Sequence, residues 1–513
     1  MKITFIQGPS ENLAIEYFSR ILMKEGYKVS LIVDYQLFDS VNLKNNFLKN
    51  LFDIKDILVD QVIKSKPDLV GFSIFTSEYQ WALDFASRIK KRNSRIPIIF
   101  GGIHPTSVPE LVIKQKAVDM VCVGEGEQAL LELTKSIDSN KKNYNIPNLW
   151  FKKDGKIIKN EIRPLLQNLD DIPFPYKDIF YVKAPPFLRS YYLIMATRGC
   201  PYQCTYCANH VKFKVYAGKG KYVRMRSVAN VMKELNWAKK RYPQIKMVSL
   251  PDDILPLNKE WMREFIGRYK KEINLPFLCY AHPRNIDLEM ATLLKEGGCF
   301  WLNMGLQTAS EKNRIKLLHR VESNDEIRAA AKNCHKVGLK FSLDHIFGIP
   351  YEGKKEYVEG LKLYNELRPS SMNVFWLIYF PKTEIIELGE KAGYINEDIE
   401  NKINEGKVSN CAVFKVSGND EDISRTKEGE FKNFALLYTL LPVISQKVMD
   451  LIIKRKWYDK IKNISNIFFI LAKIISRLSV KQIYLYTSEI KRISWFIYSV
   501  LKTKWSYRNA RVL

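Results

Sequence analysis

Short apolar runs alternate with stretches of helical periodicity from residue 1 to residue 138. Apolar runs at 3–7, 29–33, 68–75, 96–100 and 120–123 predict five strands. Segments 11–24, 47–66 and 78–91 predict the helices between them. This alternation predicts a doubly wound, parallel α/β sheet, in which ligands bind at the carboxyl ends of the strands.

A second alternation begins near residue 191. The patterns predict a partial (β/α)6 barrel of parallel strands, whose active site would lie at the carboxyl ends of those strands. The expected strands are 193–197, 247–250, 277–280, 300–304, 341–347 and 373–380, and helical patterns between them include 228–240, 260–271, 288–296 and 325–337.

The composition divides the chain into four parts. We expect a first α/β domain at 1–138, a linker rich in Pro, Asn and Lys at 139–190, the barrel at 191–400 and a helical region at 401–513. In that last region, 434–449, 466–478 and 489–501 are expected to be helices. With 8 cysteines in 513 residues, the chain is not a disulfide scaffold. No apolar run reaches the ~18 residues of a membrane span and no signal peptide is visible, so a cytoplasmic location is expected.

The charge is unevenly distributed. The net charge is +26, and the last 63 residues carry 14 Lys and Arg against two acids. Eleven aromatic residues lie in the same segment, 451–513. Basic and aromatic residues together suit a peripheral position on a membrane, which would favour a lipid or another apolar substrate. The alternative is that the aromatics pack on the barrel and the lysines face water. No nucleic-acid recognition motif accompanies the charge, so no nucleic-acid partner is expected.

Three cysteines within eight residues carry the clearest chemistry. Cys200, Cys204 and Cys207 directly follow the first predicted barrel strand. Three close thiolates suit an iron–sulfur cluster with one iron left open. The alternative is a zinc site in which His210 is the fourth ligand.

The spacing C-x3-C-x2-C, with Tyr206 before the last cysteine, resembles the radical S-adenosylmethionine superfamily. Later segments resemble this superfamily in the same order: 249–253, 304–310, 347–353 and 380–383. The resemblance implies that the three cysteines hold a 4Fe–4S cluster, and that S-adenosylmethionine binds beside Tyr206, Asp252, Asp253, Gly305 and Gln307. Gln307 stands where the superfamily usually has Glu, and Ala309 where it has Gly.

The first domain resembles the cobalamin-binding domain that precedes this barrel in one branch of the superfamily. The resemblance rests on Gly101-Gly102-Ile103-His104 and on Gly124-Glu125-Gly126-Glu127. The loop after the first strand lacks the Asp-x-His-x-x-Gly motif whose His ligates cobalt, so we expect no histidine on the metal. The expected cobalamin contacts are Gly8, Gly101, Gly102, His104, Gly124, Glu125 and Gly126.

Polar residues near strand ends are the candidates for substrate chemistry. They are Tyr379, Asp344 and His282, together with Arg284 and His345. For each, the alternative is a hydrogen-bonded residue of the core. The other cysteines lie in apolar settings, as buried free cysteines commonly do.

The resemblance implies a cobalamin-dependent radical enzyme, most directly one that methylates an unactivated carbon. Its cofactors would be a 4Fe–4S cluster, S-adenosylmethionine and cobalamin, with a flavodoxin or ferredoxin type of electron donor. The alternatives are a ring-forming, rearranging or carbon–carbon coupling reaction with the same cofactors, or a non-catalytic corrinoid and iron–sulfur protein.

Overall fold

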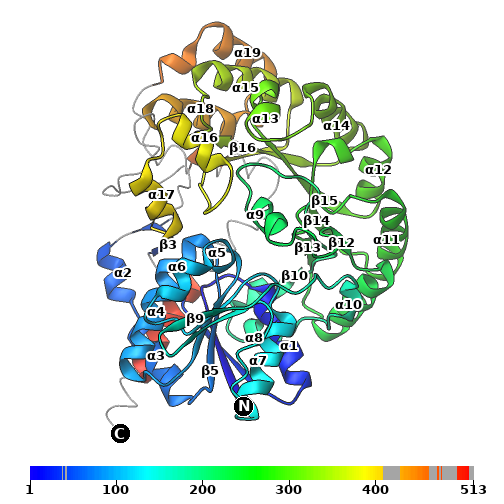
Figure 1. Cartoon of the computed structure of the whole chain (residues 1–513). Coiled ribbons are helices and arrows are strands. Elements are labelled where there is room, and N and C mark those ends of the chain that lie inside the picture. Colours follow the sequence, from blue (N-terminus) through cyan, green and yellow to red (C-terminus); the bar gives the residue numbers. More distant parts are fainter. Residues whose placement is uncertain are drawn as a thin grey trace.

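The structure, a computed structural model, describes residues 1–36, 39–40, 43–44, 46–407, 428–461, 471–472, 475 and 494–507. Two α/β units make up most of it (Figure 1). The first is an open sheet with helices on both faces. The second is a curved sheet whose helices form an outer arc, in which α10, α11, α12 and α14 follow one another (Figure 1).

The first sheet has seven strands in the order β2-β1-β5-β6-β7-β8-β9. The five predicted strands are present and parallel. Two further strands extend this sheet in antiparallel fashion, inside the segment that was expected as a linker. The strands are β1 (Lys2–Gln7), β2 (Lys28–Val33), β5 (Leu69–Ser73), β6 (Ile98–Gly101), β7 (Met120–Cys122), β8 (Leu149–Lys153) and β9 (Lys156–Lys159).

Helices cover both faces of this sheet because its strands are apolar on both faces. Phe5 belongs to a core cluster that continues into the barrel, whereas its neighbour Ile6 packs in a second cluster on the opposite face. The principal helices are α1 (Leu13–Lys24), α3 (Lys55–Lys64), α4 (Tyr79–Arg92), α5 (Ile103–Ser107), α6 (Pro109–Lys114) and α7 (Glu127–Asp138).

The helix predicted at 47–66 is wrong as one element. It is two helices, α2 (Asn46–Phe52) and α3. Between them the side chain of Asp53 accepts a hydrogen bond from the backbone N–H of Lys55 at 2.8 Å. Such a bond competes with the helical pattern and favours a turn. Short strands β3 (Asp39–Ser40) and β4 (Leu43–Lys44) precede these helices.

The second sheet has six parallel strands in the order β10-β13-β14-β15-β16-β17, as a partial (β/α)6 barrel requires. The strand predicted at 193–197 is divided: β10 ends at Leu193, and Thr197–Arg198 forms β11, which pairs with β12 (Arg224–Met225). The strands are β10 (Tyr191–Leu193), β13 (Met247–Leu250), β14 (Phe277–Ala281), β15 (Cys299–Gln307), β16 (Phe341–Phe347) and β17 (Ser371–Trp376).

The barrel helices agree with the predicted ones to within one residue at each end. The predicted helix 288–296 is α12 (Leu288–Glu296) without change. The link to the first domain includes α8 (Asp178–Tyr181), whose Ile179 and Phe180 join the shared core cluster. The others are α9 (Ala208–Val215), α10 (Val228–Arg241), α11 (Lys259–Glu272), α13 (Glu311–Lys316), α14 (Asn324–Val337), α15 (Lys354–Leu367), α16 (Ile385–Lys391) and α17 (Glu397–Asn404).

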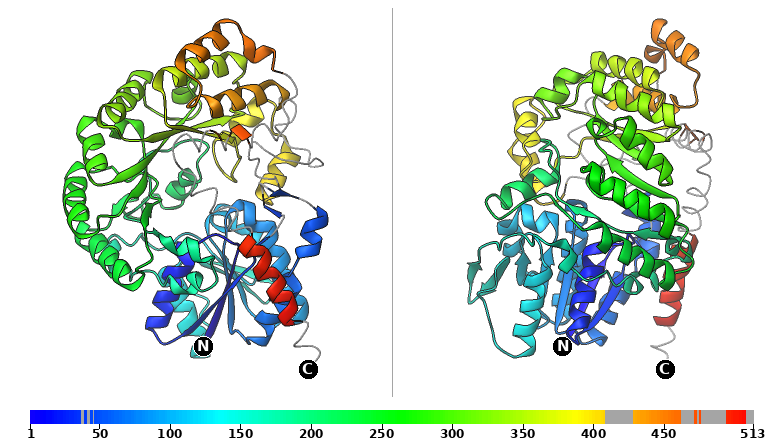
Figure 2. Two further views of the ribbon diagram at one scale, coloured as in Figure 1. Left: turned by 180° about the vertical axis from the view of Figure 1, so that it is seen from behind. Right: turned by 90° about the vertical axis from the view of Figure 1, so that its right-hand side faces the viewer.

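The carboxyl-terminal region divides between the two units. The helix predicted at 434–449 is wrong as one element, because Pro442 and the N-cap Ser445 separate α18 (Glu428–Leu440) from α19 (Gln446–Lys454). Both pack against α15. Residues 494–507 form a helix that lies along the first domain, drawn red in Figure 2. Most of the predicted helix 466–478, residues 489–493 and Cys411 lie outside the described residues. Among the described helices, none is long and apolar enough to cross a bilayer.

Candidate functional site

The three cysteines lie on one loop between β11 and α9, at the carboxyl end of β10. Cys204 is buried, and Cys207 is the N-cap residue of α9. Thr205 fixes the middle of the loop: its N–H donates to the carbonyl of Leu318 at 3.2 Å and its hydroxyl to that of Leu317 at 2.7 Å. Burial raises the pKa of Cys200 to about 12, so a bound metal would have to displace the thiol proton.

Three thiolates on one loop are the donor set of a 4Fe–4S cluster, which takes each thiolate on a different iron. A single zinc ion would need a fourth ligand beside them. His210, the fourth ligand of the zinc alternative, faces Glu384, with Nε2 and Oε2 3.6 Å apart.

Arg320 joins two of the residues predicted to bind S-adenosylmethionine. Its guanidinium donates to the carbonyl of Gly305 at 2.7 Å and to the hydroxyl of Tyr206 at 3.4 Å. It also lies 4.0 Å from the sulfur of Cys204. A Cβ at position 305 would lie 2.5 Å from Nε2 of Gln307, which has a positive φ of 72°. Tyr206 and Gly305 therefore both contact one buried cation beside the cysteine loop, and Gln307 packs against Gly305.

A buried ionic network extends from Arg320 to the other side of the loop. Glu322 accepts from Nε of Arg320 at 2.6 Å, and its second oxygen lies 3.0 Å from Nε2 of His282. The ring of His282 stacks on Tyr202, which lies between Cys200 and Cys204, with centroids 4.0 Å apart. Burial raises the pKa of Glu322, but His282 and Arg320 outweigh this effect and hold it at about 2. His282 is thus placed to support the cluster loop; its catalytic role stays a prediction.

Arg320 and Glu322 are functional residues that no motif in the sequence indicates. Their only signal is a pair of opposite charges two residues apart, in the loop that follows α13. Exposed loops commonly contain such pairs, where they contribute little. This pair differs because both side chains are buried, which the spacing in the sequence does not reveal.

The acidic pair after β13 divides into two roles. Asp252 is buried, and its Oδ1 accepts from the N–H groups of Ala196 and Thr197 and from the Thr197 hydroxyl. Its Oδ2 has no partner among the described residues. Asp253 is exposed. Burial is the main cause that raises the thiol pKa values of Cys200 and Cys207, and the nearby charge of Asp253 raises them further. Asp252 anchors the segment before the cluster loop through Oδ1, and Asp253 is the exposed member of the pair.

A polar ladder crosses three strands on the concave face of the barrel. The hydroxyl of Ser342 donates to Asn303 at 2.8 Å, and the amide of Asn373 donates to Asp344 at 2.8 Å. Tyr280 and Phe375, on the same face, are 40% and 47% exposed. Burial raises the pKa of Asp344 to about 6.

The other three strand-end candidates do not contribute to this face. Arg284 forms an exposed ion pair with Glu326, with Nε and Oε1 2.9 Å apart. His345 lies next to Asp344 in the strand and faces outward, where its Nδ1 is 2.8 Å from the hydroxyl of Tyr364. Tyr379 is buried in a separate apolar cluster with Ile385 and Ile395. A catalytic role for Tyr379 stays a prediction, and the burial of its side chain does not support it.

The loops at the carboxyl ends of β1 and β6 hold the first set of residues predicted to bind cobalamin. A Cβ at Gly8 would lie 3.2 Å from Nε2 of Gln36, a buried nitrogen without a partner among the described residues. Gly102 has a φ of 101° and packs on the backbone of Ile74. Buried unpaired polar atoms are rare and mark room for a ligand or water. The amide and phosphate acceptors of a corrinoid fit the nitrogen of Gln36.

His104 is fully buried beneath these loops. Its Nδ1 lies 3.3 Å from the hydroxyl of Thr76, and its ring is 4.2 Å from that of Tyr79. Burial lowers the pKa of His104 to about 4, so the ring is neutral near pH 7. These contacts favour a core residue under the loop and not a ligand that reaches a metal.

Gly124, Glu125 and Gly126 face a different neighbour. Gly126 packs on Phe18 of α1, whereas Gly124 and Glu125 contact Tyr216 at the end of α9. The carboxylate of Glu125 binds Arg224. The loop therefore lies between the two domains, and its contact with cobalamin stays a prediction.

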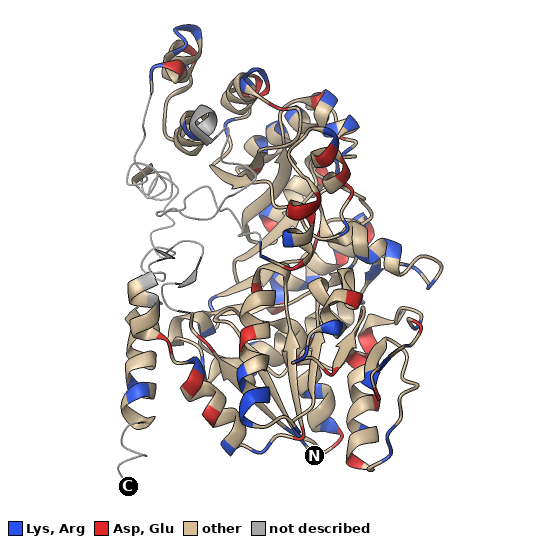
Figure 3. Ribbon diagram, turned by 60° about the vertical axis from the view of Figure 1, so that its left-hand side comes forward, with Lys and Arg blue, Asp and Glu red and all other residues tan. Residues whose placement is uncertain are grey.

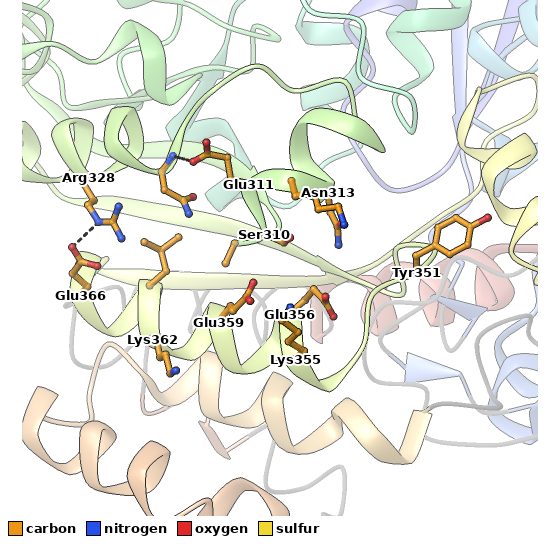
Figure 4. A pocket seen from close by; sticks show the side chains of 14 residues that line it. Ser310, Glu311, Asn313, Arg328, Tyr351, Lys355, Glu356, Glu359, Lys362 and Glu366 are labelled. Atoms are coloured by element: carbon orange, nitrogen blue, oxygen red, sulfur yellow. Dashed lines mark hydrogen bonds and ion pairs between the residues drawn. The ribbon is translucent and has the colours of Figure 1, made fainter.

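A polar pocket of about 580 Å³ lies apart from all of these residues, between α13, α14 and α15. Figure 4 shows Tyr351 at one end and the Arg328–Glu366 ion pair at the other. Lysines and glutamates both line its wall (Lys312, Lys355, Lys362, Glu311, Glu356, Glu359). It contains no cysteine and none of the predicted site residues.

Two family models match the chain. Residues 3–134 match the B12 binding domain, and residues 194–363 match the Radical SAM superfamily. These matches confirm the predicted combination and its order along the chain.

Curated relatives cover the same parts. An uncharacterized methyltransferase of Pyrococcus horikoshii is 29% identical over 59% of this chain and 65% of its own length. The anaerobic magnesium-protoporphyrin IX monomethyl ester cyclase of Rubrivivax gelatinosus is 22% identical over 66% of this chain and 61% of its own. The chain thus spans less than two thirds of either relative. A cytidylyl-2-hydroxyethylphosphonate methyltransferase of Streptomyces wedmorensis is 23% identical over 66% of this chain and 69% of its own length.

Two solved structures share the fold. The cobalamin-dependent S-adenosylmethionine radical enzyme OxsB, with aqua-cobalamin and S-adenosylmethionine bound, superposes with a TM-score of 0.63 at 16% identity, over 98% of this chain and 83% of that one. The radical S-adenosylmethionine methyltransferase TsrM from Kitasatospora setae, with cobalamin and a [4Fe-4S] cluster bound, superposes with a TM-score of 0.61 at 18% identity. The match covers 77% of this chain and 79% of that one. Both carry the two-domain architecture described above. This chain therefore joins a B12 binding domain to a Radical SAM domain, in that order along the sequence.

Proposed function

We propose that the protein is a cobalamin-dependent radical enzyme that methylates an unactivated carbon of a small molecule. The observation that supports this most is the loop of Cys200, Cys204 and Cys207, at the carboxyl end of the first barrel strand and next to the loops of the B12 binding domain. Two of the relatives are named as methyltransferases, which supports methylation as the outcome of the reaction.

The residues of the chain bind and orient the cofactors and the substrate, and they exclude water. The cysteine loop would hold the cluster, and Tyr206, Gly305, Gln307 and Asp253 would surround S-adenosylmethionine. When bound, the cluster and S-adenosylmethionine supply the one-electron chemistry that removes a substrate hydrogen, and cobalamin supplies a methyl group. The curved sheet shields that chemistry from solvent.

The substrate would bind on the concave face of the barrel. Asp344 offers a carboxylate, and Tyr280 and Phe375 offer exposed aromatic surface on either side of it. Such a face suits a molecule with a hydroxyl or amino group beside an apolar part. The description of TsrM with a tryptophan substrate supports a small molecule of this kind.

A ring-forming or coupling reaction is the second candidate, because relatives include cyclases and a 4'-phospho-dehydrooxetanocin synthase. Product mass distinguishes the two. The reduced enzyme is incubated with a cell extract and S-adenosylmethionine whose methyl group carries deuterium. Methylation gives a product that contains the deuterated methyl group, whereas cyclisation gives an unlabelled product of altered hydrogen content. A chain that cleaves no S-adenosylmethionine would instead be the non-catalytic corrinoid protein.

We also infer a flavodoxin or ferredoxin type of electron donor, since the cluster must be reduced once for each cleavage. Its test is S-adenosylmethionine cleavage with each purified donor in place of a chemical reductant. A donor that sustains no cleavage, while the chemical reductant does, is excluded.

We infer peripheral contact with membranes through the carboxyl-terminal helix. Five of the nine large hydrophobic side chains that are more than half exposed in the described part of the chain lie on α2 and the helix 494–507. The two helices touch, because Nζ of Lys504 donates to the carbonyl of Leu51 at 2.5 Å. We call this surface the apolar ridge; it consists of Phe47, Leu51, Tyr498, Leu501 and Trp505.

The inner face of the same helix is already occupied. Phe496 stacks on Tyr35 at 4.9 Å, and Val500 is buried in the core of the first domain. Lys and Arg are otherwise mixed with acids over both domains (Figure 3). The apolar ridge, with Lys502 beside it, therefore supports a membrane contact better than the overall charge does. A substrate delivered from lipid would follow from it.

A further inference from the structure

The loop after β7 binds two arginines that flank the cluster loop. Nη2 of Arg224 donates to Oε1 of Glu125 at 2.6 Å and Nη1 to Oε2 at 3.1 Å, a two-pronged ion pair. Nη1 of Arg198 lies 3.5 Å from Oε1 of Glu125, and Nη2 donates to Oε1 of Glu127 at 2.6 Å. Two carboxylates of the B12 binding domain thus bind two guanidinium groups of the Radical SAM domain.

A third contact reaches the opposite end of the cluster loop. The backbone N–H of Glu125 donates to the hydroxyl oxygen of Tyr216 at 2.5 Å. Gly124, with a φ of 85°, leaves no room for a Cβ, which would overlap that hydroxyl group. The glycine is required here both by its backbone conformation and by the close approach of Tyr216.

These contacts border the cysteine loop on both sides. Arg198 precedes Cys200 by two residues and pairs across β11 and β12 with Arg224. Cys207 is the N-cap residue of α9, and Tyr216 is the C-cap residue of the same helix. One loop of the first domain therefore touches the segment before the first cysteine and the end of the helix after the last.

The burial of these groups makes the arrangement specific. The side chain of Arg224 is 4% exposed and that of Glu125 is 26% exposed. Burial raises the pKa of Glu125, but Arg224 and Arg198 outweigh this effect and hold it below its ordinary value. A bidentate pair fixes orientation as well as distance, and a buried arginine that loses its carboxylate is strongly unfavourable. Interfaces between domains of one chain permit relative motion unless they are large and apolar. The two domains share an apolar core cluster, which gives attraction without direction, and these ion pairs add a fixed orientation at the cluster loop.

We propose that Glu125, Arg198, Arg224 and Tyr216 form an interdomain latch that fixes the separation between the cobalamin site and the cluster site. The latch rests on the proposed function, because it needs both cofactors in one chain. Its members are positioning residues: none is required to touch either cofactor. Without the latch, each domain would still bind its cofactor, but the distance between the two would vary.

The direct test measures that distance. The full chain, loaded with cluster and cobalamin, is reduced to the state in which both carry an unpaired electron. Pulsed dipolar electron paramagnetic resonance then gives the distribution of cobalt-to-cluster distances. We expect a single narrow distribution for the wild-type chain. Glu125→Gln, which removes the charge and keeps the shape, should at least double its width in the molecules that hold both cofactors.

Two comparisons keep the result specific. Glu110→Gln removes the exposed ion pair with Lys159 inside the first domain and should leave the width unchanged. Tyr216→Phe removes one neutral acceptor and disturbs folding least; it should broaden the distribution less than Glu125→Gln does. A broad distribution in the wild-type chain, or an unchanged width in both latch variants, would overturn the proposal.

A second measurement needs no cofactor. In the chain without cofactors, hydrogen exchange of the loop 124–127 should be at least tenfold faster in Glu125→Gln and in Tyr216→Phe than in the wild type. Equal exchange rates would overturn the latch. A chain with a narrow distance distribution that forms no methylated product would contradict the proposed function and support the latch, so the two failures are distinguishable.

Discussion

Asp252 holds Thr197 through one oxygen atom: Oδ1 accepts the backbone N–H at 2.5 Å and the hydroxyl at 2.7 Å. The segment before the cysteine loop is thereby attached to the end of the neighbouring strand. Asp252→Ala would leave these buried donors unpaired, which costs about 3 kcal/mol of stability. We expect the variant to bind less than half the wild-type iron, measured as iron and sulfide per chain after reconstitution. The exposed Asp253→Ala is the control and should retain the full amount; equal loss in both variants would show that the anchor is not the cause.

The cobalt should carry no histidine from the protein. His104 is buried against Tyr79 and Thr76, and burial lowers its pKa to about 4. Electron paramagnetic resonance of the cobalt(II) form should lack nitrogen splitting from an imidazole, and His104→Ala should leave the spectrum unchanged. A changed axial signal in that variant would mean that the loop after β6 opens to the metal.

Asp344 should make stability depend on pH. Burial raises its folded pKa to about 6, above the unfolded value. The folded state therefore binds the proton more tightly, and stability falls as pH rises from about 4 to about 6. At pH 8 the ionised carboxylate costs about 1–3 kcal/mol. Asp344→Asn should thus gain more stability relative to wild type at pH 8 than at pH 5.

Denaturant unfolding of the full chain at the two pH values measures this difference. Asp325→Asn, at a position whose side chain is 92% exposed, is the control and should show no such trend. A stability difference for Asp344→Asn that is the same at pH 5 and pH 8 would contradict the raised pKa.

Membrane binding should depend on the apolar ridge. Replacing Tyr498, Leu501 and Trp505 together with Ser should reduce co-sedimentation with vesicles that contain phosphatidylserine at least fivefold, because these side chains would enter the interface. Val182→Ser, which removes an equally exposed side chain elsewhere, should bind as the wild type does. Equal binding by all three proteins, or no binding by any of them, would remove the argument for a substrate delivered from lipid.

Periodicity and glycine loops were sufficient to predict the parallel strands of both sheets. The five parallel strands of the first sheet and the six of the barrel were all expected, because buried parallel strands read as apolar runs between helices. The antiparallel strands β8 and β9 were missed, because they lie in a segment whose composition is typical of a linker. The misassigned helices have a local cause. Asp53 in one and Pro442 with Ser445 in the other interrupt a periodic apolar pattern, and the periodicity outweighed these single residues in the prediction.

Only the part of the site that belongs to a sequence motif could be predicted. The cysteine loop could be located from spacing alone, whereas the partners that hold it could not. Arg320 and Glu322 lie in a loop after α13, and Arg224 lies on a two-residue strand. Their importance comes from burial next to residues distant in the sequence, which no spacing reveals. Glu125 shows the same limit, since its loop was recognised but its partners lie in the other domain.

Cleavage of S-adenosylmethionine by the purified chain tests the central claim most directly. The chain is reconstituted with iron, sulfide and cobalamin under anaerobic conditions, reduced, and mixed with S-adenosylmethionine. We predict that 5′-deoxyadenosine forms with the wild type and with Cys334→Ala, which alters a buried cysteine outside the loop. It should fall to background in the variant that carries Ala at positions 200, 204 and 207. Formation by that triple variant, or none by a wild-type chain that holds its full cluster, would contradict the account.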